Sequence, residues 1–301
     1  MELFTNIPEI LANDIRASNP WWRGEKLADV KPYRRWPFDL IVKRITDGPA
    51  PVTALRGPRQ VGKTTLLEQV IDKFLEGGIT PTRILRVQFD QVELYRKMEA
   101  PMLMMVQWFE ENILKKTLNQ AALDGEPALL FFDEVQIVPD WSSQLKHLVD
   151  LQPVRVFITG SSALRIELGR DSLAGRLSTL EMGPLLLREI AAIRGFGDVK
   201  SLLPSNGLES LVKQDFWREV RASGEKWREI RDIAFASFSA RGAFPVAQYR
   251  HSIPWEEMAD YLIESVIRRV TTIDLKTSER GRSRDVPLME EVLRLACIYI
   301  C

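Results

Sequence analysis

Hydrophobic and polar positions divide the chain into two parts with different periods. The first part contains four short apolar runs, at 51–56, 83–89, 128–132 and 154–159. The last two are apolar at nearly every position, which is typical of strands buried on both faces of a parallel sheet. Apolar residues at helical spacing lie between the runs, at 64–75, about 101–119 and about 140–150. This alternation predicts an α/β fold, a parallel sheet with helices on both faces.

The period changes after residue 186, where amphipathic helical patterns such as 217–238 and 255–274 take over. The stretch 240–245 interrupts them, because its glycine frees the backbone and its proline cannot continue a helix. We therefore expect an N-terminal segment at 1–44, an α/β domain at 45–195, a helical linker or lid at 196–240 and the start of a helical C-terminal domain at 241–301. The final apolar pattern, 290–301, lacks a glycine or basic cap, which predicts that this last domain is truncated.

Composition narrows the class of protein. Hydrophobic residues make up 45% of the 301 positions and charged residues 27%, as in soluble globular domains. Lys plus Arg total 41 and Asp plus Glu total 41, so the formal net charge is zero. The chain therefore has no overall positive charge that would indicate nucleic-acid binding. Two cysteines and two histidines provide neither a disulfide framework nor the usual zinc ligands. Without a signal-like N-terminus or a long apolar run, we expect a cytoplasmic protein with no membrane partner.

A phosphate-binding motif follows the first apolar run. Residues 57–64 read GPRQVGKT and match G-x-x-x-x-G-K-[ST] at every fixed position, between a predicted strand and a predicted helix. The glycines let consecutive backbone N–H groups face a phosphate at the positive end of the helix. Lys63 can bridge two phosphates, and the Thr64 hydroxyl suits Mg²⁺; the alternative is a glycine turn with a solvated lysine. The predicted nucleotide-binding residues are Gly57, Pro58, Arg59, Gln60, Val61, Gly62, Lys63, Thr64 and Thr65.

Two carboxylates end the third apolar run, at the edge of the sheet where open α/β folds bind ligands. Asp133 is predicted to hold Mg²⁺ together with Thr64, and Glu134 to polarise the attacking water. The alternative is a pair of solvated carboxylates that cap a strand.

Hydroxyl groups and arginines follow the fourth run. Ser161 and Ser162 are placed to bind a γ-phosphate or the attacking water, although either serine could instead cap a helix. Arg176 follows the turn 173–175, and we expect it, with Arg170, on a flexible segment near the ligand edge. Arg176 would assist hydrolysis in its own site or in that of a neighbouring subunit, unless it is a solvated loop arginine.

At these motifs the sequence resembles the predicted prokaryotic AAA+ superfamily ATPases that carry a C-terminal domain of unknown function. The matching strings are GPRQVGKTTLL at 57–67, FDEVQ at 132–136, TGSSA at 159–163 and LAGR at 173–176. The resemblance covers about 45–195 and, more weakly, 242–269. It implies a P-loop NTPase fold, an Asp-Glu pair that hydrolyses ATP with Mg²⁺, and an arginine that acts on the γ-phosphate. It assigns no cellular role.

Three functions follow from these features. The first is a Mg-dependent ATPase that transmits its nucleotide state through the C-terminal region to an unidentified protein partner. The second is a nucleotide-gated binding module with little turnover. The third is a DNA-dependent ATPase, suggested by Trp21, Trp22 and Trp36 among arginines and by the arginine-rich stretch 278–285, although tryptophans can equally anchor a segment on the core. Neutral net charge also leaves self-association open.

Overall fold

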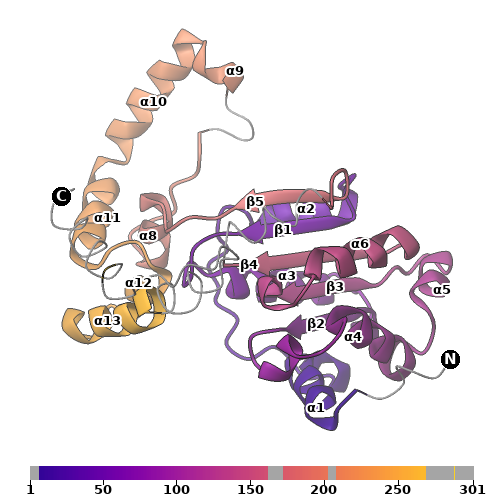
Figure 1. The fold of residues 1–301 in the computed structure, drawn as a ribbon. Coiled ribbons are helices and arrows are strands. Elements are labelled where there is room, and N and C mark those ends of the chain that lie inside the picture. Colours follow the sequence, from indigo (N-terminus) through magenta and orange to yellow (C-terminus); the bar gives the residue numbers. More distant parts are fainter. Residues whose placement is uncertain (1–6, 162–171, 203–207, 269–287, 289–301) are drawn as a thin grey trace. The chain divides into compact units, whose positions relative to one another are not determined.

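The computed structural model describes residues 7–161, 172–202, 208–268 and 288. By internal contacts the chain divides into two compact units, residues 1–58 with 62–183, and residues 59–61 with 184–301. The first unit contains a β-sheet, and the described part of the second unit, apart from the short loop 59–61, is built from helices and their connections (Figure 1).

Five parallel strands form the sheet, in the order β2-β3-β4-β1-β5. The four strands predicted from the sequence are confirmed as β1 (Val52–Arg56), β2 (Ile84–Gln88), β3 (Leu129–Asp133) and β4 (Arg155–Gly160). The sequence missed β5 (Leu177–Glu181), because this edge strand is only partly buried and its Leu-Ser-Thr-Leu-Glu sequence contains no apolar run.

Helices cover both faces of the sheet, so the predicted α/β class is confirmed (Figure 1). On one face, Ala54, Phe132 and Ile158 share a core with α1, α4, α5 and α6. On the other face, α2 and α3 pack on the strands, and Phe131 lies between Phe74 and Phe157. These helices span α1 Glu9–Ser18, α2 Phe38–Asp47, α3 Lys63–Glu76, α4 Pro101–Phe109, α5 Leu118–Leu123 and α6 Trp141–Leu151.

Shorter turns connect these elements. The helix expected at about 101–119 is instead divided into α4, a π-helical turn at Glu110–Leu114, and α5. Single 3₁₀ turns lie at Pro20–Arg23, Pro81–Arg83, Glu93–Arg96 and Val135–Ile137.

The N-terminal segment is hydrogen-bonded to β2, one of the two edge strands of the sheet. The Asn19 side-chain amide donates to the backbone carbonyls of Ile15 and Arg86, each at 2.7 Å, and its oxygen accepts the Arg86 N–H at 2.7 Å. The Trp21 and Trp22 indoles both donate to the carbonyl of Ile84. Two of the three tryptophans considered for base stacking therefore anchor the segment on the sheet.

The second unit is built on the packing of α8 against α11, through Leu185, Ile190, Ala191 and Ala234. The helix predicted at 217–238 is interrupted at Trp227, which separates α10 from α11, and α11 ends beside Gly242 at the predicted break. Its helices span α8 Leu187–Ile193, α9 Leu208–Leu211, α10 Gln214–Lys226, α11 Arg228–Arg241, α12 Pro245–Tyr249 and α13 Trp255–Leu262, followed by a π-helical turn at Ile263–Arg268.

Two predicted features, the apolar pattern 290–301 and the arginine-rich stretch 278–285, lie outside the described residues. Within the described ranges, every helix is too short or too polar to cross a lipid bilayer.

We expect Asn19→Ala to lower the free energy of unfolding by about 2–4 kcal/mol, because it leaves the buried Arg86 N–H and two carbonyls without their side-chain partner. Urea unfolding of the nucleotide-free chain measures this change. Asn119→Ala, at an exposed position of α5, is the control and should change the stability by less than about 0.5 kcal/mol. Equal effects of the two variants would contradict the anchoring role of Asn19.

Candidate functional site

The glycine motif forms a loop between the carboxyl end of β1 and the first residue of α3. Gln60 and Gly62 have positive φ angles of 63° and 93°, a left-handed conformation that glycine adopts freely and glutamine adopts at a cost. The first backbone N–H groups of α3, which lack hydrogen-bond acceptors inside the helix, therefore lie at this loop. Such a loop and helix terminus together favour the binding of an anion.

Lys63 is the first residue of α3 and is buried. Its ammonium group donates to the carbonyls of Gly57 at 3.1 Å and Pro58 at 2.9 Å, and it lies 3.9 Å from a carboxylate oxygen of Glu134. The cation is thus held at the loop that the motif assigns to phosphate. The remaining predicted residues Arg59, Gln60 and Val61 lie in the same loop, and Thr65 lies in the first turn of α3.

Asp133 and Thr64 form the oxygen pair expected for a divalent cation. The Thr64 hydroxyl donates to Asp133 Oδ2 at 2.8 Å, and the Thr159 hydroxyl donates to Asp133 Oδ1. Burial of the carboxyl group raises the pKa of Asp133 to about 6, and the Glu134 carboxylate adds to this, while the two hydroxyl donors oppose it.

These oxygens fit Mg²⁺, which is bound in proteins through one or two side-chain oxygens together with phosphate and water. A cation beside Asp133 would also offset the desolvation of its carboxylate. Elsewhere in the described ranges, no three His, Cys, Asp or Glu side chains gather into a metal site.

Glu134 and Ser161 are in direct contact. The Ser161 hydroxyl donates to Glu134 Oε2 at 2.8 Å, and the Gln136 amide donates both to Ser161 Oγ at 2.9 Å and to Glu134 Oε2. The Glu134 backbone N–H donates to the Thr159 hydroxyl at 3.2 Å, at a left-handed φ of 55°. The carboxylate predicted to polarise water is therefore held by two side chains.

The sequence motifs indicate no role for Thr159 and Gln136, although both residues lie within the strings TGSSA and FDEVQ. Their positions depend on the register of β3 and β4, in which Phe132 pairs with Ile158 and the next residue on each strand, Asp133 and Thr159, lie side by side. This pairing of strands cannot be derived from one sequence. Ser162 and Arg170 lie outside the described residues.

The expected position of Arg176 is wrong. Arg176 immediately precedes β5, and its carbonyl accepts the N–H of Val52, the first residue of β1. The phosphate loop leaves the other end of β1, so the length of a five-residue strand, roughly 16 Å, separates Arg176 from it. The Arg176 guanidinium makes two hydrogen bonds to Asp150, at the end of α6.

Known proteins are similar to both parts of the chain. An uncharacterised protein of Methanocaldococcus jannaschii is 28% identical over 260 residues, which is 83% of this chain and 52% of that protein. An uncharacterised protein of Mycobacterium tuberculosis is 33% identical over 146 residues, 48% of this chain and 27% of that protein. The chain thus spans about half, or about a quarter, of the length of these relatives.

Two solved structures also align with most of the chain at 14% identity. Caenorhabditis elegans PCH-2 has a TM-score of 0.40, with 87% of this chain and 68% of that chain covered. The Walker-type ATPase of Pyrococcus abyssi has a TM-score of 0.42, with 90% of this chain and 79% of that chain covered.

Residues 49–191 match the family described as AAA domain. Residues 49–191 are thus similar to the AAA domain family, and the parallel sheet, the glycine loop and the Asp133–Thr64 pair have the arrangement of an α/β P-loop fold.

Proposed function

We propose that the chain binds ATP with Mg²⁺ at the carboxyl edge of its sheet, hydrolyses it, and changes the conformation of its helical C-terminal region in response. The observation that carries this proposal is the convergence of Lys63, Thr64, Asp133 and Glu134 around one phosphate loop. We divide the region after the ATPase domain into a linker or lid at 196–240 and a further domain from 241. A protein partner in the cytoplasm would read its nucleotide state.

Each side chain has a separate task in this proposal. Lys63 exchanges the carbonyls of Gly57 and Pro58 for phosphate oxygens, which satisfies the same ammonium donors. Thr64 and Asp133 hold Mg²⁺, which would neutralise charge on the phosphates when bound. Glu134 accepts a proton from the attacking water.

A second candidate is a nucleotide-gated binding module with little turnover. It is favoured by the hydrogen bonds that Ser161 and Gln136 make to the Glu134 carboxylate, since a carboxylate engaged in this way is less available to a water molecule. A DNA-dependent ATPase has less support, because the Trp21 and Trp22 indoles that suggested it donate hydrogen bonds to the Ile84 carbonyl and so anchor the segment on the sheet.

Lys63→Ala should weaken ATP binding by about 100-fold, because it removes a buried charged donor from the phosphate site. Glu134→Gln should leave ATP affinity within about threefold of wild type and slow hydrolysis by about 10²–10⁴-fold. Calorimetry with ATP and single-turnover hydrolysis measure the two effects. Lys97→Ala is a matched control at an exposed lysine. Equal affinity in Lys63→Ala and wild type would refute the proposed site, while hydrolysis as slow in wild type as in Glu134→Gln would favour the binding module.

Asp133→Asn should stabilise the nucleotide-free chain while abolishing the Mg²⁺ dependence of ATP binding. The Asp133 pKa is about 6 in the folded chain and 3.8 in the reference state, so folding favours its protonated form. Protonated Asp133 therefore contributes to the free energy of unfolding in full below pH 3.8, and this contribution is lost as the pH rises through 6. At pH 7.5 the amide should therefore gain about 2–3 kcal/mol over wild type, and the gain should shrink towards pH 4.

Thermal unfolding at pH 4 and pH 7.5 tests this expectation, with exposed Asp47→Asn as the control. A gain that does not depend on pH would show that the buried carboxylate is not the source of the stabilisation.

Arg176 enters this proposal only as a residue that acts on a neighbouring subunit, because its own site lies at the other edge of the sheet. Arg176→Ala should reduce turnover by at least about 100-fold with little change in ATP affinity. A mixture of Arg176→Ala and Glu134→Gln should turn over ATP at least about tenfold faster than either variant alone, because one variant supplies the arginine and the other supplies the base. As a control, a mixture of Arg176→Ala with the Arg176→Ala/Glu134→Gln double variant should recover no turnover. If assemblies shown to contain both single variants recover no turnover, Arg176 does not act on a neighbouring subunit.

A further inference from the structure

A stripe of mostly apolar residues runs along α10 and into α11. It repeats at intervals of four and three residues, the spacing at which helices pair along their lengths. Its members are Phe216, Val220, Ser223, Trp227, Ile230 and Ala234. The end of the stripe at Ala234 is buried in the core with α8, whereas no residue of α10 is buried among the described residues. The half of the stripe on α10 thus extends beyond the core that covers the other half.

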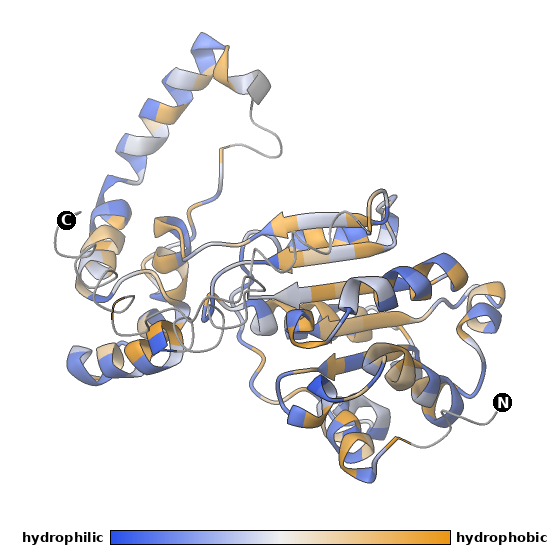
Figure 2. Cartoon of the chain, in the orientation of Figure 1, coloured by the Kyte–Doolittle hydropathy of each residue, from blue (hydrophilic) through white to orange (hydrophobic). Residues whose placement is uncertain are grey.

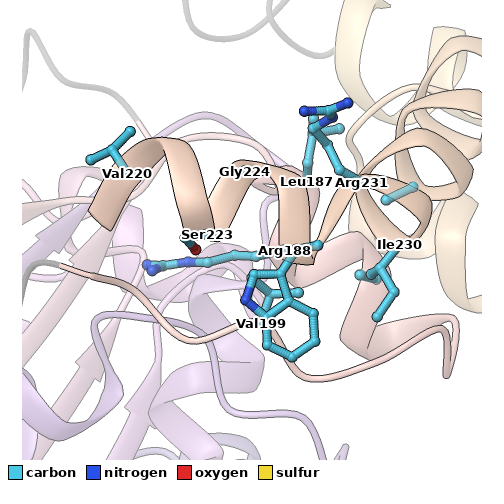
Figure 3. Close-up of a pocket in the computed structure, with 11 residues that line it drawn as sticks. Leu187, Arg188, Val199, Val220, Ser223, Gly224, Ile230 and Arg231 are labelled. Carbon is cyan, nitrogen blue, oxygen red and sulfur yellow. The ribbon is translucent and has the colours of Figure 1, made fainter. Parts of the chain in front are cut away.

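A pocket of about 300 Å³ opens where the stripe meets α8 (Figure 3). Its apolar walls come from Leu187, Val199, Val220, Trp227 and Ile230. Arg188 extends along it beneath Ser223. The volume is sufficient for an aromatic side chain, and the guanidinium adds a cation to an otherwise apolar site.

Arg188 is only partly exposed, and among the described residues it makes no hydrogen bond or ion pair. A guanidinium in this position gains from a carboxylate, because partial burial has already removed some of its water. The occupant of the pocket should therefore carry an acidic group beside an apolar one.

Gly224 lies in the same wall, in the last turn of α10. Its φ angle is not positive, and a Cβ atom added there would meet nothing within 4 Å. Glycine has a lower helix propensity than alanine, and neither a positive φ angle nor a close neighbour within the described residues requires it here. Space is left at this position for a group from outside the described unit.

We propose that two copies of this chain pair through antiparallel α10 helices, and that Phe216 of each copy fills the pocket of the other. The repeat places Phe216 opposite the partner's Trp227 and Val220 opposite the partner's Ser223. At one flank Trp217, which is 54% exposed, lies over the partner's Gly224, where the missing Cβ leaves room. Asp215, next to Phe216, pairs with Arg218 of its own helix at 2.9 Å and in the dimer would exchange this exposed partner for the partner's Arg188.

Charge selects the antiparallel direction. At the other flank Glu219 meets the partner's Lys226, and the two-fold axis produces this ion pair twice. A parallel pair would instead place Lys226 beside the partner's Arg231 and leave Glu219 facing Gly224 of the partner subunit. A second copy therefore satisfies the stripe, the pocket, the free guanidinium and the glycine together.

Sedimentation equilibrium of the full chain without nucleotide, from about 1 to 100 µM, tests the pairing. We expect a dimer with twice the 34.5 kDa mass of one chain. Gly224→Gln should weaken it at least about tenfold, because a side chain now meets Trp217, while helix content by circular dichroism does not fall. Phe216→Ala should weaken the dimer similarly without unfolding the chain, because Phe216 is not buried within one copy.

Charge reversal gives the decisive comparison. Glu219→Lys and Lys226→Glu should each weaken the dimer about tenfold, and the double variant should recover to within about threefold of wild type. Arg221→Glu, at an exposed position away from the stripe, is the matched control and should change nothing. A monomer at every concentration, a dimer insensitive to Gly224→Gln, or a double variant that does not recover would each overturn the proposal. Lys63→Ala should dimerise normally, so this result is independent of ATP binding.

Discussion

Burial of the Asp133 carboxylate is the constraint on which the phosphate site depends. Asp133 ends β3 inside the sheet, so its charge is removed from water, and two threonine hydroxyls supply only part of what water would give. One hydroxyl comes from α3 at the phosphate loop and the other from β4. The carboxylate thereby links β3, α3 and β4 at the point where a bound cation would compensate its negative charge.

The direction of the strands explains which side chains can share that site. All five strands are parallel, so residues that follow β1, β3 and β4 reach one edge of the sheet and residues that precede β5 reach the opposite edge. Ser161 and Glu134 therefore meet, whereas Arg176 lies roughly 16 Å away, beside Asp150. An arginine at that edge can serve an ATP site only if the site belongs to another subunit.

The sequence predicted the parts of the fold that are written in local patterns. Four strands, the phosphate loop and the positions of Lys63, Thr64 and Asp133 beside that loop follow from apolar runs and residue spacing. The half-buried β5 left no apolar run, and its absence from the predicted sheet put Arg176 at the wrong edge. The contacts of Gln136 and Thr159 were missed for a related reason, because they arise from the pairing of β3 with β4 and from a left-handed residue at Glu134.

Each unit contains a charged group that is at least partly buried, a carboxylate in the first unit and a guanidinium in the second. In the first unit a buried carboxylate has a raised pKa that a cation would reverse. In the second unit a partly buried guanidinium lies in an apolar pocket that a carboxylate would complete. If ATP fills the first site and a second copy the second, then assembly would bring Arg176 of one subunit into the same particle as the phosphate loop of another, which is the condition that hydrolysis in trans requires.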